Sequence, residues 1–386
     1  MRMMISGGGT GGHIYPALAL IEYISKAEPG SEFIYVGSLR GLENQLVVNA
    51  NMQNVAFESL EVSGFRRSIS IENVRTVVRF VRAVSRSRKL IREFKPDVVV
   101  GTGGYVCAPL VYAAARAGIP TVIHEQNAIA GLTNKFLSRY TSAVALSFRG
   151  TERKFPAARR AVYTGNPRAS QVQSGNAVAA RKKYAIPDGK KLVLVIGGSR
   201  GALAINDAIR GWIPIISDPS IHVLVVSGER YYKAWMDAAV NLTGAQVGEG
   251  RIDWNEQVTI VPYVYDMPDL LAATYLAIGR AGASSIAEWT VLGVPVILIP
   301  SPNVTANHQE ENAKSLVKAK AATMIIERDL TAEKLHHQVM AIINNESVRE
   351  SMGAAAKSIG QADAAKRLYD IVKEVMGVTK SGKRIR

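Results

Sequence analysis

Short runs of apolar, often β-branched residues alternate along the chain with longer segments whose apolar residues recur at helical spacing. In the first half these runs lie at residues 3–5, 33–36, 98–100, 121–123 and 143–146. In the second half the alternation starts again, with runs at 191–196, 222–227, 258–261, 276–278 and 294–299. Strands that alternate with helices form parallel sheets with helices on both faces. The pattern therefore predicts an α/β protein of two doubly wound, Rossmann-like domains that face each other across a cleft.

The junction between the domains is expected at residues 163–168, because Gly165 and the Asn166-Pro167 pair favour a turn. We assign residues 1–165 to an N-terminal domain and residues 166–365 to a C-terminal domain. Residues 366–386 are expected to form a helix that returns toward the N-terminal domain, followed by a basic tail. Ligands of doubly wound sheets bind at the carboxyl ends of the strands, so the loops after the strands are the candidate sites.

Glycine-rich loops directly follow three of the predicted strands, at residues 7–12, 101–104 and 197–201. Glycine lets the backbone turn sharply and bring its N–H groups, with the N-terminus of the next helix, against a phosphate. One such loop would suit a dinucleotide-binding oxidoreductase, whereas three loops in two domains suit two diphosphate-bearing molecules. The second strand also ends at residues 37–40 without the acidic residue that binds the ribose of NAD. We therefore disfavour an oxidoreductase.

Two polar segments of the second half are further candidates. Residues 280–288 run from a strand end into a helix, so that Ala283 and the serines after it would form a helix N-terminus able to bind phosphate oxygens. Glu288, one turn further on, could hold both hydroxyls of a ribose or could only compensate the helix dipole. Residues 307–313 open another helix with a polar cluster, which could cap the helix or bind the hydroxyls of a sugar.

Seven segments together resemble, in sequence and in order, the MurG family of glycosyltransferases of peptidoglycan synthesis. They lie at residues 8–16, 101–109, 124–134, 164–168, 197–206, 280–288 and 307–313. The resemblance implies the GT-B fold, in which two Rossmann-like domains face each other across a cleft. It also implies an inverting transfer of N-acetylglucosamine from UDP-N-acetylglucosamine to the C4 hydroxyl of the muramoyl sugar of undecaprenyl-diphospho-muramoylpentapeptide. Lipid I thereby becomes lipid II.

The resemblance further implies which residues bind the two substrates. Glu288 would hold the ribose, the backbone of Val264 the uracil, and Gln309 the donor sugar, while Arg168 and Ser199 would lie near the diphosphate. The implied donor-binding residues are Thr10, Gly11, Gly12, Asn127, Arg168, Ser199, Val264, Ala283, Ser284, Ser285, Ile286, Ala287, Glu288 and Gln309. The implied acceptor-binding residues are Gly103, Gly104, Tyr105, His124, Glu125 and Asn134.

Such a transferase needs a base for the acceptor hydroxyl and stabilisation of the charge on the departing UDP. His13 is the candidate base, because a neutral imidazole accepts a proton near pH 7 and a helix N-terminus favours the neutral form. His13 could instead only hydrogen-bond the substrate. His124 and Glu125 are competing candidates, and either could merely orient the loop at Asn127. No Asp-x-Asp pair follows a strand, so neither a protein-bound metal nor a cofactor is expected.

The net charge of +15 is unevenly distributed, since residues 1–165 contain 21 Lys and Arg against 11 Asp and Glu. Spacings of three and four residues place one basic set on one side of a helix, namely Arg75, Arg79, Arg82, Arg86 and Lys89. A valine set is expected on the opposite side, facing the core, namely Val74, Val77, Val78, Val81 and Val84.

A basic helix face beside apolar residues suits an anionic membrane surface, although a charge run can also be only a solvated face. The predicted membrane surface comprises Phe65, Ile69, Ile71, Arg75, Arg79, Phe80, Arg82 and Arg86. The single cysteine, Cys107, favours a reducing compartment, and no run of about 20 apolar residues is present. We expect a peripheral protein on the cytoplasmic side of the cell membrane, with a cell-wall synthesis complex as a further partner.

Three alternatives stay open. The basic net charge would suit a nucleic-acid-binding protein, but the basic helix lacks interleaved aromatic residues, so no nucleic acid partner is expected. A related transferase with a diacylglycerol acceptor, or a nucleotide-sugar epimerase, would use a similar donor. The segments 101–109 and 124–134 favour lipid I as the acceptor.

Overall fold

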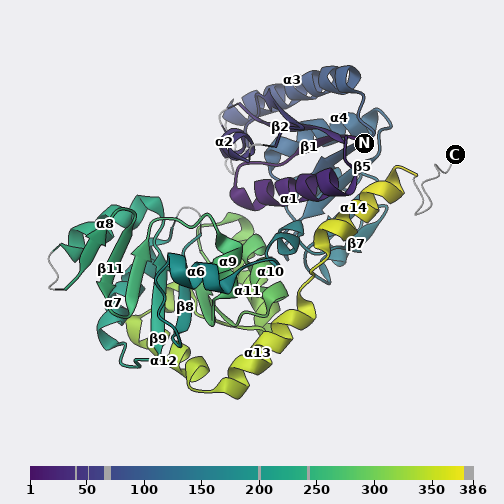
Figure 1. The fold of residues 1–386 in the computed structure, drawn as a ribbon. Coiled ribbons are helices and arrows are strands. Elements are labelled where there is room, and N and C mark those ends of the chain that lie inside the picture. The colour runs from purple at the N-terminus through teal and green to yellow at the C-terminus, as the bar shows by residue number, and fades with distance from the viewer. Residues whose placement is uncertain (40, 51, 65–70, 199–200, 241–243, 378–386) are drawn as a thin grey trace. The chain divides into compact units, whose positions relative to one another are not determined.

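The structure is a computed structural model that describes residues 1–39, 41–50, 52–64, 71–198, 201–240 and 244–377. Three residues of the predicted sites, Phe65, Ile69 and Ser199, lie outside the described residues. The chain divides into two compact units (Figure 1). Unit 1 comprises Met1–Ser170 and the segment from Asp363 onward, and unit 2 comprises Gln171–Ala362. The first division falls five residues after the expected junction, and the C-terminal helix belongs to unit 1.

Unit 1 contains a parallel sheet whose described strands have the order β3-β2-β1-β4-β5-β6-β7. They are β1 (Arg2–Ser6), β2 (Glu32–Ser38), β3 (Val55–Leu60), β4 (Val98–Gly101), β5 (Thr121–Glu125), β6 (Ala143–Leu146) and β7 (Ala161–Tyr163). The strand order changes direction between β1 and β4, which pair side by side. Ser6 at the end of β1 is opposite Gly101 at the end of β4, so the glycine loops that follow emerge together. This is the switch point at which doubly wound sheets bind ligands.

Helices cover both faces of this sheet. They are α1 (Gly11–Ala27), α2 (Leu42–Asn49), α3 (Ile71–Phe94), α4 (Ala108–Arg116), α5 (Leu132–Leu137) and α14 (Ala364–Val375). One core joins the sheet to α1 and α14 and includes Met3, Ile5 and Leu368. The other joins it to α3 and α4 and includes Met4 and Val111. Because successive strand residues point to opposite faces, neighbouring residues of β1 serve different cores.

Unit 2 contains a sheet whose described strands have the order β10-β11-β12-β9-β8-β13-β14-β15. They are β8 (Lys191–Ile196), β9 (Ile221–Val226), β10 (Gln246–Gly248), β11 (Arg251–Asn255), β12 (Val258–Val261), β13 (Leu276–Gly279), β14 (Val296–Leu298) and β15 (Ala322–Met324). The pairs β10–β11 and β11–β12 are antiparallel and the other pairs are parallel. The order changes direction between β8 and β13, so the loops after these two strands mark the switch point of this unit.

The helices of unit 2 surround a core that contains Trp212 and Trp235, both fully buried. They are α6 (Ala177–Lys183), α7 (Leu203–Trp212), α8 (Glu229–Ala239), α9 (Met267–Ala272), α10 (Ala283–Leu292), α11 (His308–Lys318), α12 (Ala332–Ile343) and α13 (Glu346–Ile359). The prediction of two α/β units with largely parallel sheets is confirmed.

Five strands were not predicted: β3, β7, β10, β11 and β15. Four of them lie at an edge of a sheet, and β11 lies next to an edge. An edge strand has a neighbour on one side only and exposes more of its residues, so it lacks the continuous apolar run of a central parallel strand. The exposed residues of β10 illustrate this.

Two details of the predicted helices differ in the structure. α1 begins at Gly11, inside the segment 7–12 expected as the first glycine loop, because glycine adopts helical dihedrals as well as loop conformations. The expected core position of the α3 valines is wrong except for Val84, which is 7% exposed. The exposed fractions of the other four are 64%, 49%, 44% and 62% for Val74, Val77, Val78 and Val81.

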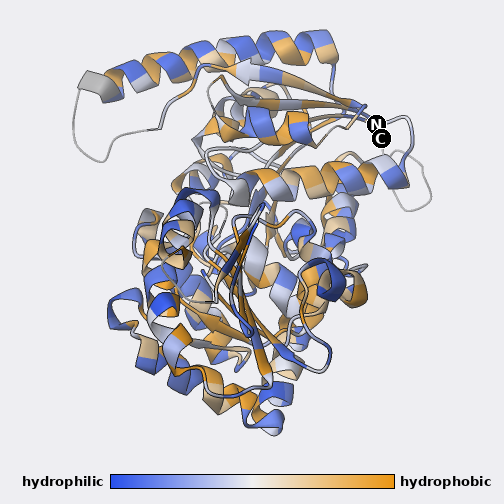
Figure 2. Cartoon of the chain, turned by 60° about the vertical axis from the view of Figure 1, so that its left-hand side comes forward, coloured by the Kyte–Doolittle hydropathy of each residue, from blue (hydrophilic) through white to orange (hydrophobic). Residues whose placement is uncertain are grey.

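α3 instead meets the sheet through a face on which small or polar residues alternate with apolar ones. The buried residues are Thr76, Ala83, Val84, Ser87, Leu90 and Ile91. Their spacing is also helical, but hydrophobicity alone does not select this face. Figure 2 shows apolar and polar residues alternating along α3.

Candidate functional site

The glycine loops after β1 and β4 are tied directly to each other in unit 1. The N–H of Gly8 donates to the carbonyl of Gly103 (3.3 Å), and the hydroxyl of Thr102 donates to the carbonyl of His13 (2.7 Å). A Cβ atom on Gly104 would lie 2.3 Å from the carbonyl oxygen of Gly8, and the φ of Gly104 is +78°. The second loop therefore requires glycine at this position, both for its backbone conformation and for its approach to the first loop.

His13 is half-buried in the first turn of α1, with Gly11 and Gly12, and Thr10 is the residue before that turn. Its Nδ1 lies 3.0 Å from the carbonyl oxygen of Gly8 and 3.2 Å from the hydroxyl of Thr10. A carbonyl oxygen only accepts hydrogen bonds, so Nδ1 carries the proton in this arrangement. In the neutral ring the lone pair is then on Nε2.

His124, a competing candidate base, is fully buried at the end of β5. Its Nε2 donates to the carbonyl of Gly165 (3.0 Å), and its Nδ1 accepts from the side-chain amide of Gln126 (3.0 Å). Burial lowers the pKa of His124 to about 4, so the ring is neutral at pH 7. Both ring nitrogens are thus engaged within the protein.

Glu125, the other competitor, is 2% exposed and holds the loop that follows β5. One carboxylate oxygen accepts from the N–H of Asn127 (3.0 Å). The other accepts from the N–H of Gly131 and from the side-chain amide of Asn134, both at 2.9 Å. Asn134 is itself buried, whereas Asn127 is half-buried. The carboxylate therefore orients the loop that carries Asn127.

Two further predicted residues of unit 1 lie beside these loops. Tyr105 opens the short 3-10 helix η1 (Tyr105–Cys107) and is 41% exposed. Arg168 is the last residue of the expected junction segment. Its guanidinium lies 5.2 Å from the ring centre of Tyr15, which belongs to α1. Unit 1 thus brings together Thr10–His13, Gly103–Tyr105, Asn127 and Arg168 around its switch point.

Buried residues that bond to the glycine loops were missed by the sequence analysis, among them Tyr35, Glu43, Thr102 and Gln126. Thr102 and Gln126 lie inside segments of the MurG resemblance, so their place in a motif was a usable signal. Glu43 follows the second strand by five residues, in the first turn of α2. The acidic residue that binds the ribose of NAD is expected at the end of that strand, at residues 37–40. Glu43 lies beyond this segment, so the pattern does not single it out.

The corresponding loops of unit 2 follow β8 and β13. After β8, a Cβ atom on Gly197 would lie 2.6 Å from the backbone nitrogen of Ala202, and one on Gly201 2.4 Å from the carbonyl oxygen of Ser227. The glycines therefore permit close backbone contacts at Ala202 and Ser227, whereas Ser199 lies outside the described residues. After β13, α10 begins at Ala283, as predicted.

The loop before α10 is held from two sides. The side-chain amide of Asn312 donates to the carbonyl of Ala281 (3.1 Å), and Arg280 donates to the carbonyl of Ile299 (3.0 Å) and pairs with Glu327. Along α10, Ser284 and Ser285 are half-buried and Glu288 is 7% exposed. Burial of these polar side chains at a helix N-terminus is typical of a ligand site.

The remaining donor-site candidates lie on the next loops of unit 2. Gln309, in the first turn of α11, accepts from the N–H of Ser301 (2.9 Å) and so joins α11 to the loop after β14. Val264 is buried between β12 and α9. Trp289, next to Glu288, packs beneath β13, where a Cβ on Gly279 would lie 3.1 Å from its ring. Ile286 and Ala287 complete the first turns of α10.

α3 presents basic and apolar side chains together at the surface of unit 1. Arg75, Arg82 and Arg86 are exposed, and Arg79 and Phe80 are half-buried, beside the four exposed valines. Ile71 is the first residue of α3. Some of the arginines pair with carboxylates, as Arg79 does with Glu61 (3.7 Å) and Arg86 with Glu58 (3.2 Å).

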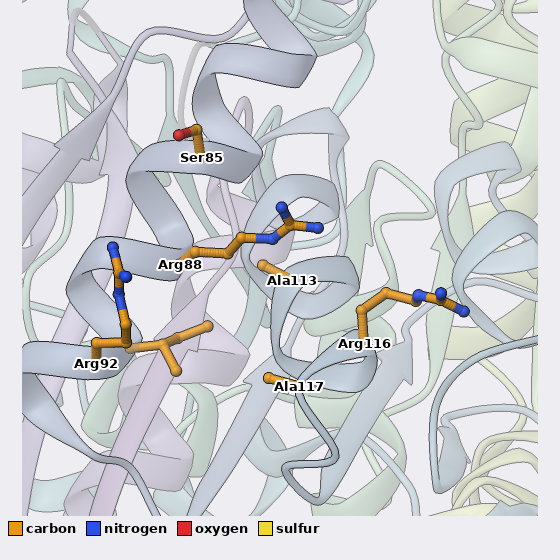
Figure 3. A pocket seen from close by; sticks show the side chains of 7 residues that line it. Ser85, Arg88, Arg92, Ala113, Arg116 and Ala117 are labelled. Carbon is orange, nitrogen blue, oxygen red and sulfur yellow. The ribbon is translucent and has the colours of Figure 1, made fainter.

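A groove between α3 and α4 continues this basic surface (Figure 3). It is lined by Ser85, Arg88, Ile91, Arg92, Ala113, Arg116 and Ala117. Arg88 reaches from α3 toward α4, while Arg92 and Arg116 extend in different directions. Among the described residues no carboxylate pairs with these three arginines, in contrast to Arg79 and Arg86.

None of the helices in the described part of the chain combines the length and the apolar character that a membrane crossing requires. Within the same residues, no three His, Cys, Asp or Glu side chains gather as a set of metal ligands.

Comparisons with known proteins agree along the whole chain. Residues 3–146 match the glycosyltransferase family 28 N-terminal domain, and residues 192–368 match the glycosyltransferase family 28 C-terminal domain. A protein of Bacillus cytotoxicus is 48% identical over 376 residues, which are 97% of this chain and 100% of that protein. It is named UDP-N-acetylglucosamine–N-acetylmuramyl-(pentapeptide) pyrophosphoryl-undecaprenol N-acetylglucosamine transferase.

Solved structures give the same result for the fold. The crystal structure of MurG from Acinetobacter baumannii has a TM-score of 0.74 and 27% identity, over 97% of this chain and 99% of that one. A UDP-N-acetylglucosamine 2-epimerase from Listeria monocytogenes, described as putative in its name, has a TM-score of 0.68 at 14% identity, over 100% of this chain and 99% of that one. The second likeness concerns the GT-B-like fold alone. On the domain matches and the whole-length identity, the chain belongs to glycosyltransferase family 28 and, within it, to the MurG family.

Proposed function

We propose that this protein transfers N-acetylglucosamine from UDP-N-acetylglucosamine to the C4 hydroxyl of the muramoyl sugar of lipid I, forming lipid II. The observation that carries the proposal is the 48% identity to a transferase of that name over 97% of the chain. The geometry supports it, because each unit has glycine loops and a helix N-terminus at its switch point, as the binding of diphosphate-bearing substrates requires.

The donor is assigned mainly to unit 2. Phosphate oxygens would meet the N–H groups at the start of α10 and of the loop after β8, where Ser199 lies in the sequence. Glu288 is suited to the ribose, since a buried carboxylate can accept from two neighbouring hydroxyls. Val264 would bind the uracil through its backbone, and Gln309 the sugar. From unit 1, Asn127, Arg168 and the Thr10–Gly12 turn would contact the donor.

His13 is the proposed base of the reaction. With its proton on Nδ1 and its lone pair on Nε2, the neutral ring can accept the proton of the acceptor hydroxyl. The acceptor oxygen then bonds to the anomeric carbon of the donor sugar while the bond from that carbon to the UDP oxygen breaks. The electron pair leaves with UDP, and the anomeric configuration inverts.

The acceptor is assigned to the second glycine loop. Gly103, Gly104 and Tyr105 adjoin His13, and Tyr105 is exposed enough to reach a ligand. For His124, Glu125 and Asn134 we propose a supporting part, because all three are buried and hydrogen-bonded within the protein. Glu125 accepts from the N–H of Asn127, Asn134 donates to Glu125, and His124 bonds Gly165 and Gln126. This arrangement favours His13 over His124 and Glu125 as the base.

The test is an assay of labelled UDP-N-acetylglucosamine with purified lipid I, with wild-type protein and with His13→Ala. We expect lipid II from the wild type and a kcat about two to four decades lower for the variant, the usual contribution of a general base. Its affinity for UDP should be unchanged. A sugar product formed without any lipid acceptor would indicate the epimerase instead, and turnover of diacylglycerol but not lipid I would indicate the related transferase.

We also propose that unit 1 binds the anionic cytoplasmic surface of the membrane through α3. Exposed valines beside arginines combine apolar contact with attraction to anionic headgroups, at about 1 kcal/mol for each basic residue near the surface. Arg88, Arg92 and Arg116 of the groove, which pair with no carboxylate in the described part of the chain, would add to this attraction. An acceptor that carries an undecaprenyl chain stays in the membrane, so such binding would bring the enzyme to it.

Vesicle sedimentation tests the membrane proposal. The triple variant Arg75→Glu, Arg79→Glu, Arg82→Glu should leave phosphatidylglycerol vesicles while still using a short-chain acceptor analogue. The variant Arg153→Glu, Lys154→Glu, Arg159→Glu makes the same change in net charge at exposed positions after β6 and should remain bound. Equal binding of both triple variants would count against α3 as the membrane surface.

A further inference from the structure

Glu43 is a fully buried carboxylate in unit 1, and the mechanism above does not use it. It belongs to the first turn of α2. Its Oε1 accepts hydrogen bonds from the N–H of Ser38 (2.7 Å) and from the hydroxyl of Ser38 (2.5 Å). Its Oε2 accepts from the N–H of Gly9 (3.4 Å). One carboxylate thus joins the loop after β2 to the glycine loop after β1.

Glycines from three separate segments make room for this side chain. A Cβ atom on Gly8 would lie 2.8 Å from the carboxyl carbon of Glu43, and one on Gly37 would lie 2.5 Å from its Cγ. A Cβ on Gly41 would lie 2.2 Å from its Oε1. Burying a carboxylate costs free energy unless hydrogen bonds replace those it made with water. If the side chain at position 43 only filled space, an apolar residue would therefore be more stable there. The arrangement indicates a task that needs the charge and the acceptors.

The loop that Glu43 holds also holds His13. The N–H of Gly9 donates to Glu43, and the preceding carbonyl, that of Gly8, accepts from Nδ1 of His13 (3.0 Å). Tyr35 holds Gly7, the residue before Gly8, because the hydroxyl of Tyr35 donates to the carbonyl of Gly7 (2.6 Å). The direction of the Gly8 carbonyl is therefore set by anchors on both sides of it. That carbonyl in turn decides which nitrogen of His13 carries the proton.

We propose that Glu43 is a positioning residue of the transferase site, which orients the Gly8 carbonyl and thereby holds His13 with its lone pair on Nε2. The inference rests on the proposed function, in which His13 is the base. Glu43 touches no substrate in this account and acts only through the loop. Tyr105 is a neutral hydrogen-bond donor at pH 7, and burial first and Glu43 second raise the pKa of its phenol further above the ordinary value.

The first experiment compares wild type with Glu43→Gln. The amide keeps one acceptor oxygen but directs an NH2 group at either Ser38 or Gly9, both of which present N–H donors. We expect kcat to fall about 10- to 100-fold, the cost of misplacing a reacting group by about 1 Å. The affinity for UDP should change little, because Val264 and Glu288, the proposed uracil and ribose contacts, belong to unit 2.

A double-mutant cycle separates positioning from general stability. If Glu43 acts through His13, Glu43→Gln should lower the residual rate of a His13→Ala protein by less than twofold, because the residue it positions is already gone. Equal factors in both backgrounds would overturn the proposal. ¹⁵N spectroscopy of the imidazole gives an independent readout: the neutral ring of the wild type should be protonated at Nδ1, and Glu43→Gln should populate both tautomers. An unchanged tautomer would also overturn it.

Two further variants keep the test decisive. Thr121→Val removes a buried hydroxyl that accepts from the N–H of Ser142. Thr121 is the first residue of β5, at the end away from His124 and Glu125. The variant should lower stability without changing kcat. If Glu43→Gln does not fold, Ser38→Ala removes one donor to the same carboxylate and should still lower kcat, by about two- to tenfold. A wild type that cannot use lipid I would refute the proposed function, whereas an active wild type with a fully active Glu43→Gln would refute only the positioning of His13.

Discussion

Gly104 offers a sharp test of how closely the two glycine loops of unit 1 must approach each other. In Gly104→Ala the new Cβ would lie 2.3 Å from the carbonyl oxygen of Gly8 and 3.3 Å from Nδ1 of His13. Carbon–oxygen contacts are ordinarily no shorter than about 3.3 Å, so one loop must move by about 1 Å. The carbonyl that must move is the one that holds His13. A displacement of about 1 Å at a reacting group costs about 100-fold in rate.

The same substitution also strains the backbone, and a second glycine of unit 1 isolates that effect. With φ +78° and ψ 161°, Gly104 lies in a region essentially confined to glycine, which costs an alanine about 1–3 kcal/mol of folding free energy. Gly118, just after α4, also has a positive φ, of +76°, but a Cβ there would meet nothing within 4 Å. Gly118→Ala therefore carries the strain of a positive φ without the clash. Both variants should lose about 1–3 kcal/mol from strain, and Gly104→Ala about 1–3 kcal/mol more from overpacking.

The assay measures kcat/KM with a short-chain lipid I analogue, together with urea unfolding of each variant. We expect kcat/KM to fall about 100-fold in Gly104→Ala and to stay within twofold of wild type in Gly118→Ala. If both variants lose similar stability and both keep wild-type kcat/KM, the close approach of the two loops has no part in catalysis. That result would also remove the geometric support for His13 as the base.

Three other predictions follow from the same structure. Glu288→Ala should mainly raise KM for UDP-N-acetylglucosamine, because a buried carboxylate that binds the ribose is lost; an unchanged KM would contradict the ribose contact. Glu28 accepts hydrogen bonds from Lys373 and Tyr369 of α14, both at 2.5 Å. Burial alone would raise the pKa of Glu28, but these bonds outweigh it and lower the pKa. The stabilisation is therefore present above the unfolded pKa, near 4.3, and is lost as pH falls through the lower folded value. Lys373→Met should thus destabilise unit 1 at pH 7 but much less at pH 3 in urea unfolding, and an equal loss at both would exclude the ion pair as the cause. His124→Asn should lower stability, since Gly165 and Gln126 lose a partner. It should not shift the pH–rate profile, because burial keeps His124 neutral down to about pH 4. A shifted profile would restore His124 as a candidate base.

Much of the fold was predictable from local signals. The central strands of both sheets are continuous apolar runs followed by glycine or polar turns, and these were found at nearly their true bounds, as for Lys191–Ile196. The edge strands were not found, because they are short and partly polar. Their pairing depends on a neighbour far away in the sequence, such as β2 for β3.

The candidate site divides in a similar way. The glycine loops and the N-terminus of α10 were recognisable because a turn and a helix start need particular residues at fixed places. The exposed valines of α3 were misplaced, because hydrophobicity selected Val74 and Val81 whereas packing selected Thr76 and Ser87. A helix face that meets a sheet closely can consist of small residues, and only the neighbouring elements determine that.

From local patterns alone, two α/β units with glycine loops after their central strands are predictable, since apolar runs and turn residues act locally. The folded structure adds that Glu43 turns inward to Gly9 and that Gly104 lies against the Gly8 carbonyl, both through atoms far apart along the chain. The contact of His13 Nδ1 with the Gly8 carbonyl spans only five residues, but that carbonyl belongs to the loop that these distant segments contact. Buried hydrogen bonds and close backbone contacts are satisfied by whichever segments the folded sheet brings together, which no local pattern specifies.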